Sequence, residues 1–275
     1  MVQNGSTSRR GIFKHVKHTR LIGAGLTLVL TLWCMWWLYG QEFRYPNTEA
    51  GRMEILQNYI VAGEGMSLRH VEPEDPLRCI AWQEVKGNLF VFYGADNDDN
   101  VHGIVRLTRG LNGKYRTEEA SMNPFPYTAG IYGENFNDIE GEEDFDLFAL
   151  GGDNCREIYE AQIEFYVYPG TEGRVHDKIK ANFSIPEPDF LWMFTSEEMC
   201  EKLGVDPEHT EGFQVDEVRL LDKDGNDVTD QYRAPGVEQN WGSGKGTAEQ
   251  FLLYVYMGIV ALLGLVIVKY FLRKN

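Results

Sequence analysis

The chain has 275 residues, and its 26 Lys and Arg against 42 Asp and Glu give a net charge of −16. None of the acidic residues and only eight of the basic ones lie in residues 1–40 and 250–275, so residues 41–249 carry a net charge of −24. Because so acidic a body repels phosphate, nucleic acid is excluded as its partner.

Two apolar stretches, residues 21–39 and 251–268, contain no charged side chain. About 20 apolar residues in a helix cross the roughly 30 Å hydrocarbon core of a bilayer. We therefore predict transmembrane helices over residues 21–40 and 250–270. A cleaved signal peptide is the alternative for the first stretch, but its apolar core exceeds the usual length of about 7–15 residues and Leu38-Tyr39-Gly40 is a poor cleavage site.

Aromatic and basic residues at the ends of these stretches predict how they lie in the membrane. Short flanks rich in Lys and Arg stay on the cytoplasmic side, and such flanks precede the first stretch and follow the second. The sequence thus predicts a two-pass cell-membrane protein, bacterial by this signal, with both termini cytoplasmic. Trp and Tyr favour the headgroup layer. The predicted interface residues are Trp33, Trp36, Trp37, Tyr39, Tyr254, Tyr256 and Tyr270.

Small residues recur within both predicted spans, and small residues let helix backbones approach closely in lipid. Their frequency in transmembrane helices in general is the alternative explanation. The residues concerned are Gly23, Gly25, Gly258, Ala261 and Gly264.

The predicted organisation places one large domain between the two spans. A short tail at either end is expected in the cytoplasm, too short for a catalytic module of its own. An acidic run over residues 137–146 is the best internal boundary, if the domain has one. The predicted parts are a basic tail (1–20), a first span (21–40), an extracytoplasmic domain (41–233), a flexible linker (234–249), a second span (250–270) and a tail (271–275).

Hairpin signals and alternating apolar residues predict a mainly β extracytoplasmic domain, an antiparallel sheet or sandwich with one or two packed helices. An α+β sheet with one covered face is the alternative. Residues 89–93 are apolar throughout, which predicts a strand covered on both faces. Gly87-Asn88 is the expected turn before it. Further strands are predicted over residues 77–85, 103–109, 158–168, 213–221 and 228–232.

Two helices are predicted within this domain. Residues 49–60 place apolar side chains at helical spacing. A second helix is expected after Thr195, because Thr195 and Glu198 form a Thr-x-x-Glu capping box and Gly204 is a typical helix end.

Motifs that carry chemistry are few. Asp96, Asp98 and Asn100 offer oxygen ligands at the spacing that opens a calcium loop, but Val101 and Leu107 stand where that loop needs Gly and Glu. Calcium is therefore the single candidate cofactor, and no other cofactor is expected. The alternative is that residues 96–100 form an ordinary solvent-exposed loop between two strands.

Three cysteines lie in the predicted extracytoplasmic segment, and their odd number allows at most one internal disulfide. Their spacing fits no zinc pattern, and pairing cannot be assigned from sequence. These disulfide candidates are Cys79, Cys155 and Cys200.

No catalytic pattern stands out, so the sequence favours a non-enzymatic role. We expect a double-anchored membrane protein that presents an extracytoplasmic binding domain. It would contact the lipid bilayer and a protein partner, through its spans or its outer domain, as a subunit or accessory of a membrane complex. The alternatives are an extracytoplasmic carboxylate-based hydrolase and a ligand sensor that lacks its own output domain.

Overall fold

The computed structural model of the chain has two units. Residues 1–44 and 246–275 form one, called the helical unit, and residues 45–245 form the other, called the β unit. The structure describes residues 8–61, 76–97, 101–122, 129–136, 147–169, 177–207, 210–233, 242–245 and 247–273. The predicted internal boundary at residues 137–146 lies outside this described part.

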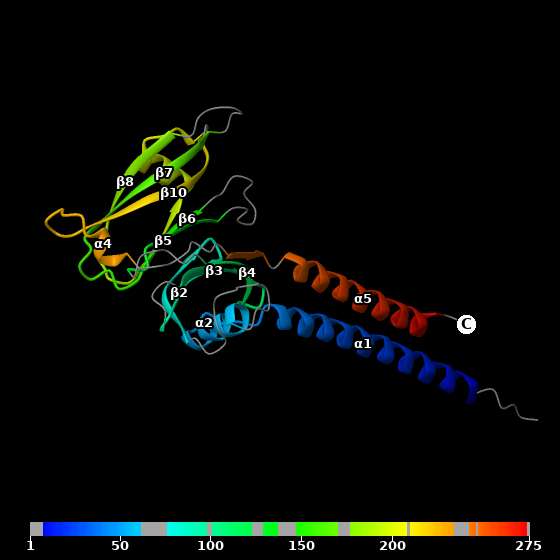
Figure 1. Cartoon of the computed structure of the whole chain (residues 1–275). Helices are drawn as coiled ribbons and strands as arrows, with labels where there is room; N and C mark the ends of the chain where they lie inside the picture. The colour runs from blue at the N-terminus through cyan, green and yellow to red at the C-terminus, as the bar shows by residue number, and fades with distance from the viewer. Residues whose placement is uncertain are drawn as a thin grey trace, which may run out of the picture. The chain divides into compact units, whose positions relative to one another are not determined.

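The helical unit consists of two long helices, α1 (Ser8–Glu42) and α5 (Thr247–Leu272), which run side by side (Figure 1). The stretches His18–Glu42 and Phe251–Leu272 are each long and apolar enough to cross a membrane. The expectation of two such helices is therefore confirmed as far as length and composition go.

The two helices pack antiparallel. At one end the Arg20 side chain donates a hydrogen bond to the Arg273 carbonyl (3.4 Å). About three turns further along α1, Thr31 lies directly against Gly264 of α5. The residue number thus rises along one helix as it falls along the other.

Only some of the predicted small residues serve this packing. A Cβ atom at Gly23 would lie 2.9 Å from the Phe271 ring, and one at Gly264 would overlap Thr31, so a larger side chain at either position would push the helices apart. Gly25 and Gly258 have nothing within 4 Å of the equivalent point. Close approach therefore depends on Gly23 and Gly264.

In the residues that the structure describes, the β unit contains three antiparallel sheets, each named here after one of its strands. The β2 sheet has the order β1-β2-β3-β4-β11, the β6 sheet β5-β6-β9 and the β7 sheet β10-β7-β8. The strands are β1 (Leu77–Val85), β2 (Asn88–Ala95), β3 (His102–Arg109), β4 (Tyr115–Met122), β5 (Tyr132–Phe136), β6 (Leu147–Gly152), β7 (Glu160–Pro169), β8 (Asp177–Ser184), β9 (Phe190–Thr195), β10 (Thr210–Leu221) and β11 (Gly242–Lys245).

Four short helical segments accompany the sheets in the described ranges of the chain. They are α2 (Glu49–Ile55), a π-helical continuation η1 (Leu56–Val61), α3 (Ser196–Leu203) and α4 (Thr229–Tyr232). The mainly antiparallel β fold with a few packed helices is thus as predicted.

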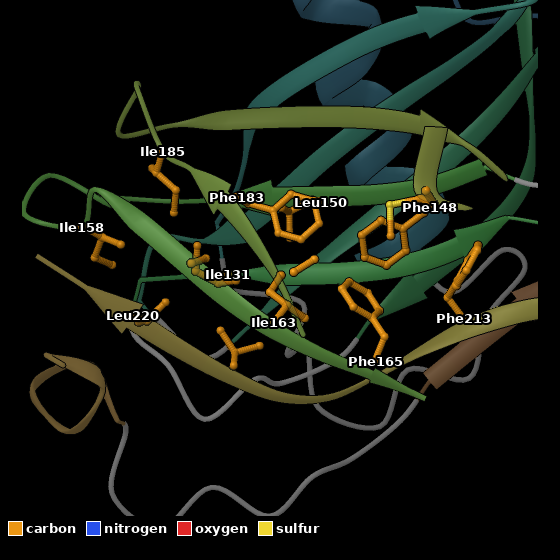
Figure 2. Packing of buried hydrophobic residues seen from close by; sticks show 14 of the residues in the cluster. Ile131, Phe148, Leu150, Ile158, Ile163, Phe165, Phe183, Ile185, Phe213 and Leu220 are labelled. Atoms are coloured by element: carbon orange, nitrogen blue, oxygen red, sulfur yellow. The ribbon is translucent and has the colours of Figure 1, made fainter. Parts of the chain in front are cut away.

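Strand β6 lies between two hydrophobic cores and is buried along its whole length. Its residues alternate, so Phe148 and Leu150 enter the core shared with the β7 sheet, and Leu147 and Ala149 enter the core shared with the β2 sheet. Figure 2 shows Phe148 and Leu150 among side chains of the β7 sheet, and the Phe148 ring meets Phe165 edge-on at 5.4 Å. The β6 sheet is therefore the middle one of three layers, whereas a simple β-sandwich has two layers.

Strand β2 is also buried at every position, which confirms that residues 89–93 are covered on both faces. Phe90 and Phe92 face the β6 sheet. Leu89, Val91 and Tyr93 face a second cluster that includes Ile55 and Leu56 of α2 and η1. A strand that is buried on both faces needs no alternation of polar and apolar residues. This explains why residues 89–93 are apolar throughout.

Local sequence signals place several elements correctly. Strand β1 has the predicted bounds, and the capping box before α3 is formed, with the Thr195 hydroxyl accepting from the Glu198 amide (3.2 Å) and the Glu198 carboxylate accepting from the Thr195 amide (2.8 Å). Gly204 ends that helix in a left-handed conformation (φ 68°).

Two local predictions are wrong. The first hairpin turns at Lys86-Gly87, both with positive φ. Asn88 is already in β2, where it pairs with Val85 and Thr108 and its side chain accepts a hydrogen bond from the Thr108 hydroxyl (3.1 Å). The expected strand over residues 228–232 is instead the single turn α4, whose first residue Thr229 accepts a hydrogen bond from the Leu220 amide.

Both ends of the β unit pair with the same strand, β4. Tyr45 exchanges two backbone hydrogen bonds with Tyr115 (3.1 and 2.8 Å). Strand β11, which lies within the predicted linker 234–249, pairs antiparallel with β4 so that Lys245 is opposite Glu119. The chain therefore begins and ends this unit at neighbouring positions on one strand.

Because Phe148 lies in the middle layer, we expect truncation of its side chain to lower the stability of the β unit. Phe148→Ala removes a buried ring from between two sheets, so we expect unfolding in urea to require about 3–5 kcal/mol less free energy. Leu111→Ala is the control, because Leu111 is 90% exposed and should change stability by about 0.5 kcal/mol or less. Equal midpoints for the two variants would contradict the assignment of β6 to the interior.

Candidate functional site

A buried polar group lies where β1, β3 and β6 meet, and it is called here the Asp153 centre: Arg78, His102 and Asp153. Asp153 directly follows β6, and one of its carboxylate oxygens, Oδ2, contacts both partners. The Arg78 guanidinium donates to this oxygen, and His102 Nε2 lies 2.9 Å from it. The centre joins the β2 sheet to the end of the middle layer.

The register of the β2 sheet brings the two basic members close together. Arg78 is opposite Gly94, and Gly94 is opposite His102, so the three residues form one row across β1, β2 and β3. A Cβ atom at Gly94 would lie 3.0 Å from Ile80 Cδ1 and 3.1 Å from His102 Cδ2. The absence of a side chain at Gly94 therefore leaves space for the His102 ring, whose Nε2 reaches Asp153.

The His102 ring is held from both sides. Phe92 stacks on it at 5.7 Å between ring centres. On the other side Gly130 adopts a left-handed backbone (φ 57°), and a Cβ atom there would lie 2.6 Å from His102 Nε2, so only glycine fits. The carbonyl of Ala129, the residue before Gly130, accepts a hydrogen bond from the Asp153 amide (3.0 Å). The backbone therefore closes over the imidazole.

The charges in the centre stabilise one another. Burial alone would raise the pKa of Asp153, but the hydrogen bonds from His102 and Arg78 outweigh it and hold that pKa below its ordinary value of 3.8. The hydrogen bond to Asp153 in turn raises the pKa of Arg78. Asp153 is thus an anion at neutral pH, bound to a permanent cation.

Access to the centre is limited to Arg78. The side chains of His102 and Asp153 are 1% and 7% exposed, against 39% for Arg78. His102 Nδ1 has no hydrogen-bond partner among the residues that the structure describes. A group so enclosed can fix the geometry of the sheets, and it offers a substrate only the outer side of one guanidinium.

Cys155 lies two residues beyond Asp153, yet it is not arranged as a nucleophile. Burial raises the pKa of the Cys155 thiol to about 12, so the thiol stays protonated near neutral pH. Its sulfur donates to the Ala129 carbonyl (3.2 Å). The residue serves as part of the core between the β6 and β7 sheets.

The predicted calcium ligands are placed only in part. Asp96 lies at the end of the β1–β2 pair, where its Oδ1 is 3.2 Å from Arg78 Nε. Asp98 and Asn100 lie outside the described residues. Within the described ranges no cluster of three or more His, Cys, Asp or Glu side chains could hold a metal ion. Calcium binding remains a prediction.

The cysteines considered for a disulfide are all free thiols in the structure, as is Cys34 in α1. Cys155 and Cys200 are buried in the same core cluster, and Cys79 is half-buried on β1. No disulfide pairing among Cys79, Cys155 and Cys200 is therefore assigned, as in the sequence analysis.

The predicted membrane-interface residues all lie on α1 or α5. Trp36 stacks on Tyr39, and Tyr39 stacks on Phe43, at 6.1 and 4.5 Å. Each of the others keeps more than half of its side chain exposed: Trp33, Trp37, Tyr254, Tyr256 and Tyr270. Their role at the lipid surface remains a prediction.

Sequence reasoning missed the Asp153 centre. Its members are separated by 24 and 51 positions, and none stands in a local motif. A two-residue turn at Lys86-Gly87 alone would place Arg78 opposite Ala95, and the register shift between Cys79 and Ala81 moves it opposite Gly94, so no local signal located the row.

The chain matches no protein-family model, and no curated protein or solved structure is significantly similar to it. The site is therefore assessed on its own geometry.

The lowered pKa of Asp153 predicts how stability depends on pH. The unfolded carboxyl binds its proton at a higher pH than the folded one, so the centre stabilises the fold fully above that point and loses this contribution as the pH falls through the lowered folded value. Between about pH 5 and pH 2, wild type should therefore lose stability more steeply than Asp153→Asn.

This comparison is made by urea unfolding at several pH values. Asp153→Asn should also cost about 1–3 kcal/mol at pH 7, because buried donors lose a charged acceptor. Asp224→Asn, in the exposed turn after β10, is the control and should follow wild type. Parallel pH curves for wild type and Asp153→Asn would contradict the inferred role of the carboxylate.

Proposed function

We propose that this chain is a two-span membrane protein that holds its β unit on the outer side of the cell membrane as a non-enzymatic binding domain. In this proposal α1 and α5 are the membrane anchor, both termini are cytoplasmic, and the protein works as a subunit or accessory of a membrane complex. Its partners are lipid and at least one other protein.

The observation that carries the proposal is the apolar exterior of the helix pair. After the two helices have packed together, large apolar side chains remain more than half exposed along both of them, for example Leu26, Val29, Leu262 and Val266. A continuous apolar surface of this kind is not stable in water and is the normal outer surface of a membrane span.

Polar groups within the pair fit the same environment. The hydroxyls of Thr27 and Thr31 donate to backbone carbonyls one turn earlier in α1, at 2.9 and 2.8 Å. A hydroxyl satisfied within its own helix can face hydrocarbon without an unpaired donor.

The orientation is supported by the antiparallel register. Arg20 and Arg273 lie together at one end of the pair, near Lys269 of α5. Basic residues at one end of a span favour the cytoplasmic side. The β unit is joined to the opposite ends, after Glu42 and before Thr247, so the same rule places it outside.

Binding is favoured over catalysis by two features of the β unit. The Asp153 centre is closed around its own ion pair. The face of the β7 sheet opposite its core is polar, and there Lys178 lies over the Tyr166 ring (4.5 Å) and pairs with Glu164 (3.3 Å). Tyrosine is enriched at protein-binding surfaces, and charged groups are found at their polar rim.

The topology is tested by thiol labelling of intact cells. Leu111 is 90% exposed, so in a Cys79→Ser background Leu111→Cys should react with a membrane-impermeant maleimide from outside. Ser8→Cys should react only after the membrane is permeabilised. Labelling of the Ser8→Cys variant and not the Leu111→Cys variant in intact cells would refute the proposed orientation.

The binding role is tested by a photo-crosslinking amino acid introduced at Lys180, on the polar face of the β7 sheet. Irradiation of intact membranes should give one defined adduct with another protein, and the adduct should be absent when the same amino acid replaces Leu111. A Lys180 variant that is correctly inserted and gives no adduct would count against this surface as the contact.

A further inference from the structure

One end of the α1–α5 pair gathers positive charge. The Arg20 side chain donates to the backbone carbonyl of Arg273, the residue that follows α5, so the two residues lie at the same end. Lys269 is one turn earlier on α5, and its carbonyl accepts from the Arg273 amide (2.9 Å), which places these two on one side of the helix. All three residues are exposed. Arg20, Lys269 and Arg273 are called here the basic end.

No acidic side chain of the helical unit lies at the basic end. Residues 1–41 and 250–275 contain no Asp or Glu, and the acids that border these ranges, Glu42 and Glu249, belong to the opposite ends of α1 and α5. The acceptor that the structure gives Arg20 is a neutral carbonyl. Packing of the two helices therefore brings like charges together, and beside an apolar phase their repulsion is stronger than in water.

The basic end also marks the edge of the apolar part of both helices. Arg20 immediately precedes the uncharged stretch 21–39, and Lys269 immediately follows the uncharged stretch 251–268. As helices these stretches are about 27–29 Å long, close to the roughly 30 Å hydrocarbon core of a bilayer. In the proposed membrane anchor the three cations therefore lie in the headgroup layer, which is where the phosphates of the lipids are.

We propose that the basic end binds the headgroup of an anionic phospholipid, whose phosphate supplies the negative charge that this end of the helix pair lacks. Arginine donates several N–H groups to a phosphate, and lysine binds it as a point charge. An anionic headgroup has a net negative charge that attracts basic residues beside a span, whereas phosphatidylcholine is neutral overall. This inference rests on the proposed membrane anchor and names the class of lipid that the helix pair selects.

A diffuse attraction between the basic N-terminal tail and the membrane is the alternative, and the length of α1 separates the two explanations. Arg10 lies ten positions before Arg20 on the same continuous helix, about 15 Å away along its axis. The headgroup layer on each side of a bilayer is only about 5–8 Å thick. Substitution of Arg9 and Arg10 therefore removes two positive charges outside the layer that contains the basic end.

The site is tested with spin-labelled lipids in phosphatidylcholine vesicles that contain the full chain, by measuring how much labelled lipid the protein immobilises. Wild type should prefer labelled phosphatidylglycerol to labelled phosphatidylcholine about fivefold, as expected for one basic residue near the surface. The double variant Arg20→Gln with Arg273→Gln should lower this ratio at least about twofold, because two of the cations are lost. The matched control, Arg9→Gln with Arg10→Gln, should keep the wild-type ratio.

Further controls separate charge from folding and lipid from soluble phosphate. Arg20→Lys with Arg273→Lys keeps both charges and should keep the wild-type ratio. Glycerol phosphate at millimolar concentration should not change the ratio, and loss of the preference in its presence would assign the basic end to a soluble phosphate. A wild-type ratio of one, or an equal decrease in the two glutamine variants, would also overturn the site.

The membrane anchor itself is checked in the same samples by flotation on a density gradient. A chain that does not float with the vesicles would overturn the anchor and the lipid site together, whereas a floating chain with a ratio of one would overturn the lipid site alone. Both leaflets contain the labelled lipids, so the result does not depend on which side the β unit occupies.

Discussion

Backbone pairing along β4 is the constraint on which the architecture depends. Tyr45 and β11 bring both ends of the β unit to this one strand, so the chain leaves the unit twice within a short distance. Within the helical unit, glycines at two contact points allow α1 and α5 to approach closely. Each unit is therefore held together by contacts between segments far apart in the sequence.

The β unit achieves rigidity by layering. Burial of β6 on both faces gives each of the other two sheets a common partner, and Asp153 at the end of that strand adds an ionic tie to β1 and β3. Replacing a buried ion pair by packed apolar residues is often neutral for net stability. We infer that the Asp153 centre chiefly fixes the position of the end of β6 against β1 and β3.

Sequence reasoning succeeded where the signal was local or strongly periodic. The apolar run of β2, the Thr195 capping box and the two long apolar helices all follow from side-chain chemistry within a few residues. It failed for β11, because Gly-Ser-Gly-Lys has the composition of a linker and becomes a strand only through residues more than 100 positions away. The first hairpin turn lies at Lys86-Gly87, whereas Gly87-Asn88 was predicted. A short turn motif can thus locate a hairpin with an error of one position.

The candidate site could not be predicted for the same physical reason. Arg78, His102 and Asp153 acquire their roles only when three strands and one loop are in place. Arginine, histidine and aspartate are each common on protein surfaces, so none of them marks a site by itself. The hairpin turn alone gives a register that is off by one at Arg78, because the register shifts between Cys79 and Ala81. The approach of Asp153 depends in addition on the packing of one sheet on another, which no local pattern encodes.

The account depends most on α1 and α5 lying antiparallel against each other in the membrane. A Cβ atom at Gly264 would lie 3.0 Å from that of Thr31, near the roughly 3.5–4.5 Å spacing of a disulfide. In a Cys34→Ser chain oxidised in native membranes, Thr31→Cys with Gly264→Cys should form an intramolecular disulfide, and Thr31→Cys with Gly258→Cys should not. Equal yields for the two pairs, or a disulfide only between separate chains, would contradict the account.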